Sequence, residues 1–358
     1  MFQPQFQRPT LAVRAGDVAP ATHGVGQDGT FYSFEGQAGR SAIVILLGRL
    51  APPEGRALLG EFERQMPGLA EFETDVVALV DMQSPRARSY GEAAPPGPRL
   101  IFSEPDVFVR CGFDSFEPAV VVMDRSSRVV AVIESGDAPR AAKMALAEVA
   151  ALPREAARDV VLPAPILHIP GIFRSDFCRE LIAHFEASPH QAGGMAAVDA
   201  HGKVFHKIDA AKKHREDFVL GPRDPYLAGA LEGIIRGVLP EIKKAFQIDA
   251  CHTDRLLIAR YDETGGYFRR HRDNAAPGVA FRQFALSVNL NSDYEGGHIL
   301  FPEYNSHRYR PGAGAGVVFS CSLLHEAAPI TKGRRYVLLT FLHNAEAQAR
   351  WLASTKRV

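Results

Sequence analysis

Two residue types that often bind metal ions stand two positions apart, at His271 and Asp273. On an extended strand, side chains two positions apart leave the same face, so both can contact one ion. A third such residue, His325, ends the segment GVVFSCSLLH, and a returning strand could bring it opposite the pair. Two histidines and one carboxylate leave metal positions open for further ligands, which favours iron(II). Zinc accepts the same three ligands and stays as an alternative.

Two more side chains suit a small acid bound to this metal. Arg335 follows His325 in HEAAPITKGRRY, on the next predicted strand. A guanidinium there can bind the distal carboxylate of a dicarboxylate while the other end chelates the metal. Tyr261 precedes His271 and offers a phenol to the same ligand. The pattern therefore predicts a metal site that also holds a dicarboxylate, and Arg335 counts against a zinc hydrolase.

Three segments, ARYDETGGYFRRHRDN, LNSDYEGGHILFPE and PGAGAGVVFSCSLLHEAAPITKGRRYVLLTFL, together resemble the prolyl 4-hydroxylase-like branch of the 2-oxoglutarate oxygenases. The resemblance covers residues 160–346, which we expect to form one domain. It implies that His271, Asp273 and His325 are iron ligands. It also implies that Arg335 anchors 2-oxoglutarate. Further pocket positions are Tyr261 and Asn289 beside the cosubstrate and Tyr267 and Arg269 beside the substrate, with strand alternation placing Arg269 on the metal face.

This resemblance implies a 2-oxoglutarate- and Fe(II)-dependent dioxygenase that hydroxylates an unactivated C–H bond. Fe(II) and 2-oxoglutarate would be its cofactor and cosubstrate, and ascorbate is a further candidate cofactor. A prolyl residue of a protein or peptide, a free amino acid and another small metabolite all stay open as substrates. Two alternatives also stay open, namely a zinc hydrolase with the same triad and a scaffold or binding protein without catalysis.

The elements that must position these residues come as helices first and strands afterwards. Amphipathic helices are predicted from Ser175 onwards and over Tyr226–Phe246, where apolar residues recur at helical spacing. Short alternating segments then follow between Gly, Pro and Asn turns. This order predicts an α+β double-stranded β-helix, or jelly roll, with supporting helices. The predicted strand segments are RLLIARY, FRQFALSVNLN, GGHILF, GVVFSCS and RRYVLLTFLH.

The first 152 residues have a different pattern, in which short apolar strands alternate with helices. Strands are predicted at Ser41–Leu47, Asp75–Val80 and Pro118–Met123, with helices over Gly55–Met66 and Ala138–Leu152. The order implies an α/β sheet and resembles the peroxiredoxin-like branch of the thioredoxin fold. That family carries its reactive cysteine after the first strand, where GRLAPPEGRALL has none. We therefore expect the fold without thiol peroxidase chemistry, and a domain that supports a homodimer or recruits a protein partner.

Composition narrows the class of protein further. Lys plus Arg balances Asp plus Glu at 41 each, so no overall charge attracts nucleic acid, and nucleic-acid binding is disfavoured. The N-terminus lacks the pattern of a secretory signal, and the apolar runs are too short to span a bilayer. The four cysteines form no CxxC pair, which argues against a disulfide framework or a cysteine zinc site. These features predict a cytoplasmic protein without membrane contact.

Overall fold

The computed structural model describes residues 13–355 except residues 21, 34–35, 37, 49–51, 85–96, 114–117, 155–158 and 199–203. The chain divides into two compact units, one of residues 9–157 and one that contains residues 158–358. Each unit has its own sheet and its own hydrophobic core. Within the described part, no helix is both long enough and apolar enough to cross a membrane.

The sheet of the N-terminal unit has seven strands in the order β2-β1-β5-β4-β3-β6-β7. Strands β3, β4 and β5 are parallel, and β6 and β7 extend the sheet antiparallel. Parallel strands joined by helices, followed by an antiparallel hairpin, form a thioredoxin-like fold, so the predicted fold is confirmed. The strands are β1 (His23–Gly26), β2 (Phe31–Ser33), β3 (Ala42–Gly48), β4 (Asp75–Asp81), β5 (Arg99–Ser103), β6 (Ala119–Met123) and β7 (Val129–Glu134).

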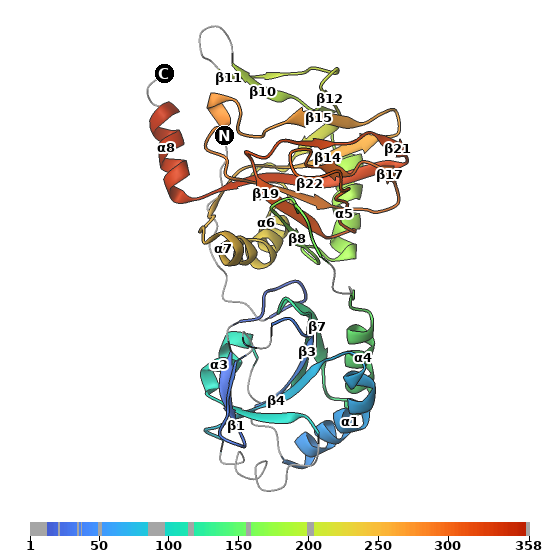
Figure 1. Ribbon diagram of the computed structural model, residues 1–358, viewed down its shortest axis with the longest axis vertical. Coiled ribbons are helices and arrows are strands. Elements are labelled where there is room, and N and C mark those ends of the chain that lie inside the picture. Colours follow the sequence, from blue (N-terminus) through green and yellow to red (C-terminus); the bar gives the residue numbers. More distant parts are fainter. Residues whose placement is uncertain are drawn as a thin grey trace. The chain divides into compact units, whose positions relative to one another are not determined.

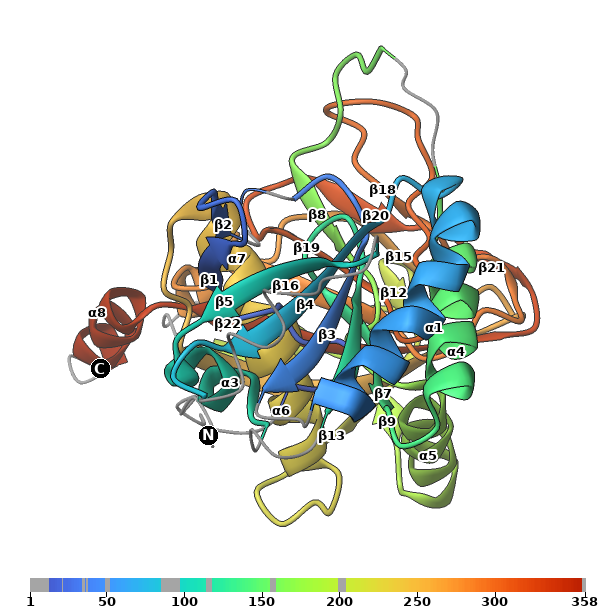
Figure 2. The ribbon, with the colours of Figure 1, turned by 90° about the horizontal axis from the view of Figure 1, so that it is seen from below.

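Alternation along β3 builds a core on both faces of this sheet. Ile43 and Ile45 pack with α1 and α4, which lie side by side on one face (Figures 1 and 2). Val44 and Leu46 pack with α3 on the other face. Apolar residues therefore run continuously along the strand, as expected when both faces are covered. The helices are α1 (Pro52–Ala70), α3 (Pro105–Cys111) and α4 (Ala138–Ala150).

The thiol of Cys111 lies at the end of α3 and is buried. Burial raises its pKa to about 11, with a smaller opposing effect of Arg110. A thiol with so high a pKa is almost entirely protonated at neutral pH and is a poor nucleophile. Residues 49–51, in the loop where the family carries its reactive cysteine, lie outside the described residues.

The C-terminal unit contains two main facing sheets that form a jelly roll. One has seven strands in the order β8-β19-β16-β22-β14-β13-β9, and the other has the order β12-β15-β20-β18. Apolar side chains between the sheets form two clusters, which confirms the predicted fold. The strands are β8 (Ile166–Ile169), β9 (Gln191–Ala192), β10 (Met195–Val198), β11 (Val204–Lys207), β12 (Lys213–His214), β13 (Glu216–Val219), β14 (His252–Asp262), β15 (Tyr267–His271), β16 (Phe284–Asn289), β17 (Glu295–Gly296), β18 (Ile299–Leu300), β19 (Gly316–Ser320), β20 (His325–Ala327), β21 (Ile330–Lys332) and β22 (Arg334–His343).

Helices α5, α6 and α7 cover the outer face of the seven-stranded sheet (Figure 1). The prediction of a single helix over Tyr226–Phe246 is wrong in one respect. The segment is divided at Val238 into two helices, α6 and α7. Pro240 is the reason: proline has no N–H for a helix interior but fits the first turn of a new helix. The helices are α5 (Ser175–Ala187), α6 (Leu227–Gly237), α7 (Leu239–Phe246), η2 (Pro277–Val279) and α8 (Ala345–Thr355).

The GAGAG segment is a turn that leads into β19. Gly314 has a φ of +75°, which favours glycine, and its N–H donates to the carbonyl of Asn289. A Cβ at Gly314 would lie 2.1 Å from the carbonyl oxygen of Phe173, whereas a Cβ at Gly312 would meet nothing within 4 Å. The turn therefore depends on glycine at Gly314 and not at Gly312.

We predict that Gly314→Ala destabilises the C-terminal unit by more than about 2 kcal/mol, since left-handed backbone strain adds to a backbone clash. Gly312→Ala is the matched control and should change the free energy of unfolding by less than about 0.5 kcal/mol. Urea unfolding of the whole chain, followed by far-UV circular dichroism, measures both variants. Equal stability of the two variants would contradict this account of the turn.

Candidate metal centre

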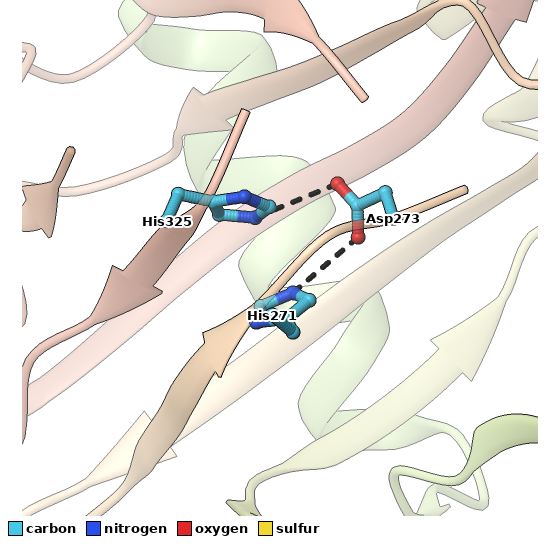
Figure 3. Close-up of side chains that lie close together, drawn as sticks. All are labelled: His271, Asp273 and His325. Atoms are coloured by element: carbon cyan, nitrogen blue, oxygen red, sulfur yellow. Dashed lines mark ion pairs between the residues drawn. The ribbon is translucent and has the colours of Figure 1, made fainter. Parts of the chain in front are cut away.

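The three predicted metal ligands lie together between the sheets of the C-terminal unit. His271 ends β15 and His325 begins β20, and the two are direct partners on neighbouring antiparallel strands. The Oδ1 of Asp273 lies 3.3 Å from His271 Nε2, and its Oδ2 lies 3.5 Å from His325 Nε2 (Figure 3). One ligand atom from each side chain falls within 4.8 Å of the others. A single ion can contact all three, and further positions stay open for exogenous ligands.

Hydrogen bonds fix which nitrogen of each histidine faces the site. The Nδ1 of His271 lies 2.7 Å from the carbonyl oxygen of Arg269, and that of His325 lies 3.0 Å from the carbonyl oxygen of Leu323. A carbonyl only accepts, so each Nδ1 carries the proton. Each Nε2 is then left with a free lone pair directed towards Asp273, as metal ligation requires.

Burial and charge keep the ligands in the protonation states that bind metal. Burial opposes ionisation of Asp273, but His325, His271 and Arg282 outweigh it and lower the pKa to about 2. Burial lowers the pKa of His325 to about 4, against the opposing effect of Asp273. Near neutral pH the carboxylate is therefore ionised and the imidazole of His325 is neutral.

A β-bulge changes the alternation predicted for β15. The register with β20 shifts between Phe268 and His271, so both rings face inward and stack, with centroids 3.4 Å apart. Arg269 is exposed, and its guanidinium lies 4.5 Å from the ring centroid of Tyr267. The placement of Arg269 on the metal face by simple alternation is therefore wrong. The hydroxyl of Tyr267 donates to the carbonyl of Ala210 at 2.7 Å.

Arg335 lies on β22 of the opposite sheet and is only 2 % exposed. Its Nε and one terminal nitrogen donate to Asn289 Oδ1 at 3.0 and 2.9 Å, and the latter nitrogen also donates to Ser287 Oγ at 3.3 Å. Tyr261 is the cross-strand partner of Arg335, with the guanidinium 5.5 Å from its ring centroid. The structure thus brings Arg335, Asn289 and Tyr261 together, as the sequence predicts.

Two residues near the site were not identified from the sequence. Arg215 donates to the hydroxyl of Tyr261 at 2.7 Å. Arg282 donates to both a carboxylate oxygen of Asp254, at 2.7 Å from Nε, and the backbone carbonyl of Asp273, at 3.4 Å. Neither belongs to a recognisable local motif, because each reaches its partner across the fold. Arg282 supports the backbone of Asp273, the carboxylate among the three candidate metal ligands.

Comparison with known proteins agrees with this site. Residues 256–343 match the family model described as the 2OG-Fe(II) oxygenase superfamily, which confirms the predicted resemblance over the segment that contains all three candidate ligands and Arg335. Such a domain implies Fe(II) and 2-oxoglutarate, and the two histidines and one carboxylate suit that ion.

The chain is also similar in sequence to curated hydroxylases and aligns with solved structures. The chain is 32 % identical over 108 residues to a PKHD-type hydroxylase of Acaryochloris marina and 32 % identical over 140 residues to one of Picosynechococcus sp.. These matches cover 29 % and 37 % of this chain and 48 % and 62 % of the relatives, so it spans less than two thirds of either. A viral collagen prolyl hydroxylase from Paramecium Bursaria Chlorella virus-1 (TM-score 0.38, 18 % identity) aligns with 51 % of this chain and 98 % of its own. A peroxidoxin from Mycobacterium tuberculosis (TM-score 0.32, 15 % identity) aligns with 40 % and 99 %.

We predict that Mn(II), a redox-stable substitute for Fe(II), binds the wild type and raises its stability. An ion at a hundredfold excess over its dissociation constant should add about 2.7 kcal/mol. His325→Ala should abolish this gain, while His307→Ala, a change at an exposed histidine, should preserve it. Thermal unfolding with and without Mn(II) measures the effect, and a gain that persists in His325→Ala would contradict the site.

We also predict that Arg282→Met weakens metal binding by about tenfold or more, since groups that support metal ligands typically contribute that much. The change removes the cation that lowers the pKa of Asp273 and the donor to its backbone carbonyl. Calorimetric titration with Mn(II) measures the affinity, with the exposed Arg350→Met as control. Unchanged affinity in a folded Arg282→Met protein would exclude this supporting role.

Proposed function

We propose that residues 160–346 form a 2-oxoglutarate- and Fe(II)-dependent dioxygenase that hydroxylates an unactivated C–H bond. The observation that carries the proposal is the position of a buried arginine, Arg335, across the same barrel from a triad of His271, Asp273 and His325. A zinc hydrolase needs the triad but has no use for this arginine. The name of the curated relatives, PKHD-type hydroxylase, supports hydroxylation.

The residues of this chain have separate tasks in such a reaction. Iron(II) bound with 2-oxoglutarate supplies activation of dioxygen, coupled to conversion of 2-oxoglutarate into succinate and carbon dioxide. Arg335 binds the distal carboxylate, and its bonds to Asn289 and Ser287 hold the guanidinium in place before the ligand arrives. Tyr261 accepts from Arg215, so its own O–H stays free to donate to the cosubstrate. The sheets exclude bulk water from these groups.

For the first 152 residues we propose a binding module rather than a peroxidase. Support comes from the buried, protonated thiol of Cys111 and from the absence of cysteine in GRLAPPEGRALL. Such a module would recruit a protein partner or support a homodimer. For the whole protein, we propose three classes of substrate for hydroxylation: a prolyl residue of a peptide or protein, a free amino acid, and another small metabolite.

We predict that the wild type, purified without oxygen and then given Fe(II), 2-oxoglutarate and oxygen, forms succinate even without a substrate. His271→Ala should form none, because a ligand is lost. Arg335→Ala should raise the KM for 2-oxoglutarate by about a hundredfold or more, since a buried charge-assisted contact is removed. Chromatographic measurement of succinate tests all three proteins. A wild type that binds zinc and forms no succinate would favour the hydrolase or the scaffold.

A further inference from the structure

A cluster of charged side chains lies where β12 of the four-stranded sheet leads into β13 and β14 of the seven-stranded sheet in the C-terminal unit. It contains three cations, Lys213, Arg215 and Arg255, and one carboxylate, Asp217. An oxygen of Asp217 lies 3.3 Å from Lys213 Nζ and 3.7 Å from a terminal nitrogen of Arg255, and the other oxygen lies 2.7 Å from Arg215 Nε. The strand partner of Asp217 is Ala259, which belongs to the apolar cluster between the sheets. Three positive groups therefore share one negative group inside the barrel.

Close backbone packing encloses this cluster. A Cβ at Gly193 would lie 2.8 Å from an oxygen of Asp217 and 2.9 Å from Lys213 Cε, so a larger residue there would displace these side chains. The ammonium of Lys213 donates to the carbonyl of Gly194 at 2.8 Å. The side chains of Lys213, Asp217 and Arg215 are 2 %, 4 % and 8 % exposed. Bulk water therefore screens these charges poorly.

The excess positive charge is energetically unfavourable in this environment. Burying an ion without a compensating partner costs several kcal/mol in order of magnitude. Burial, together with the charges of Arg215 and Arg255, lowers the pKa of Lys213 to about 7 against the opposing effect of Asp217. Even with Lys213 neutral, the guanidinium groups of Arg215 and Arg255 share the carboxylate of Asp217. Asp254, which also attracts Arg255, is already paired with Arg282. A bound anion would remove this imbalance.

Arg255 is the member of the cluster that is least engaged, because its one ion pair is the 3.7 Å contact with Asp217. Lys213 donates to Gly194, and Arg215 donates to Tyr261. Arg255, in contrast, has no hydrogen-bond partner among the described residues, and its side chain is 21 % exposed. Its planar guanidinium thus offers paired N–H donors in the geometry that suits a carboxylate.

The cluster borders the metal centre on two sides. The ring of Phe268, which stacks on His271, lies 5.2 Å from Lys213 Nζ and 5.7 Å from Arg215 Cζ. On the other side, Arg255 interacts electrostatically with Asp254 and Arg282, and Arg282 donates to the backbone carbonyl of Asp273. A small molecule with one carbon at the metal could therefore extend a carboxylate towards Arg255.

We propose that the acceptor substrate carries a carboxylate, that Arg255 binds it, and that Lys213 and Arg215 supply the surrounding positive field. This inference rests on the proposed function and narrows it to small carboxylic acids, including free amino acids. An uncharged prolyl ring within a peptide would leave Arg255 with only Asp217, which it shares with Lys213 and Arg215.

We predict that protein loaded with Zn(II) and 2-oxoglutarate, which is inert to oxygen, binds propionate saturably and does not bind propionamide. The two probes differ only in the group that Arg255 would contact. Arg255→Gln should weaken propionate binding at least tenfold, and Arg255→Lys should retain part of it. Arg223→Gln, at an exposed arginine, is the matched control and should behave as the wild type. Ligand-observed NMR titration measures each affinity.

Equal binding of the two probes, or propionate binding that survives Arg255→Gln, would overturn the proposed anion site. Propionate that competes with 2-oxoglutarate would also overturn it, because the binding group would then be Arg335. Binding of 2-oxoglutarate is measured in the same samples. A wild type that fails to bind 2-oxoglutarate contradicts the oxygenase itself, whereas normal 2-oxoglutarate binding without propionate binding contradicts the anion site alone.

Discussion

The pairing of β15 with β20 is the interaction on which the metal centre depends. It places His271 directly opposite His325, although the two are far apart in the sequence, and Asp273 follows from the same strand end. The backbone carbonyls two residues before each histidine then orient both rings. A change of register between these strands would separate the two histidines and break both orienting hydrogen bonds. The candidate metal site therefore forms only when the strands pair in this register.

Charge inside the barrel is organised around two cationic regions. Arg335 lies against Asn289 and Ser287, while Lys213, Arg215 and Arg255 gather around Asp217. Tyr261 lies between them, since it is the cross-strand partner of Arg335 and accepts from Arg215. Two separate positive regions suit two separate anionic ligands. Burial strengthens the attraction between each region and an anion, because the local dielectric is low.

The sequence predicts the groups whose geometry is local and misses those set by tertiary contacts. His271 and Asp273 follow from strand periodicity, and the match to an oxygenase pattern adds His325 and Arg335. The bulge after Phe268 has no such signal, which is why Arg269 is exposed rather than directed at the metal. The sequence also does not predict the roles of three arginines, Arg215, Arg255 and Arg282. A charged residue gives the same sequence signal whether its side chain faces solvent or a buried carboxylate.

The hydrogen bonds that hold Arg335 have a consequence for the cosubstrate of the proposed oxygenase. The guanidinium is fixed to one sheet by Asn289, which is itself held by Tyr294 and by the carbonyl of Pro311. The triad is fixed to the other sheet. In the proposed oxygenase, the two ends of the cosubstrate would therefore bind to different sheets, and the spacing between the sheets would favour acids of one chain length. Selectivity for that length would then come from the packing of the two sheets as well as from the charge of the arginine.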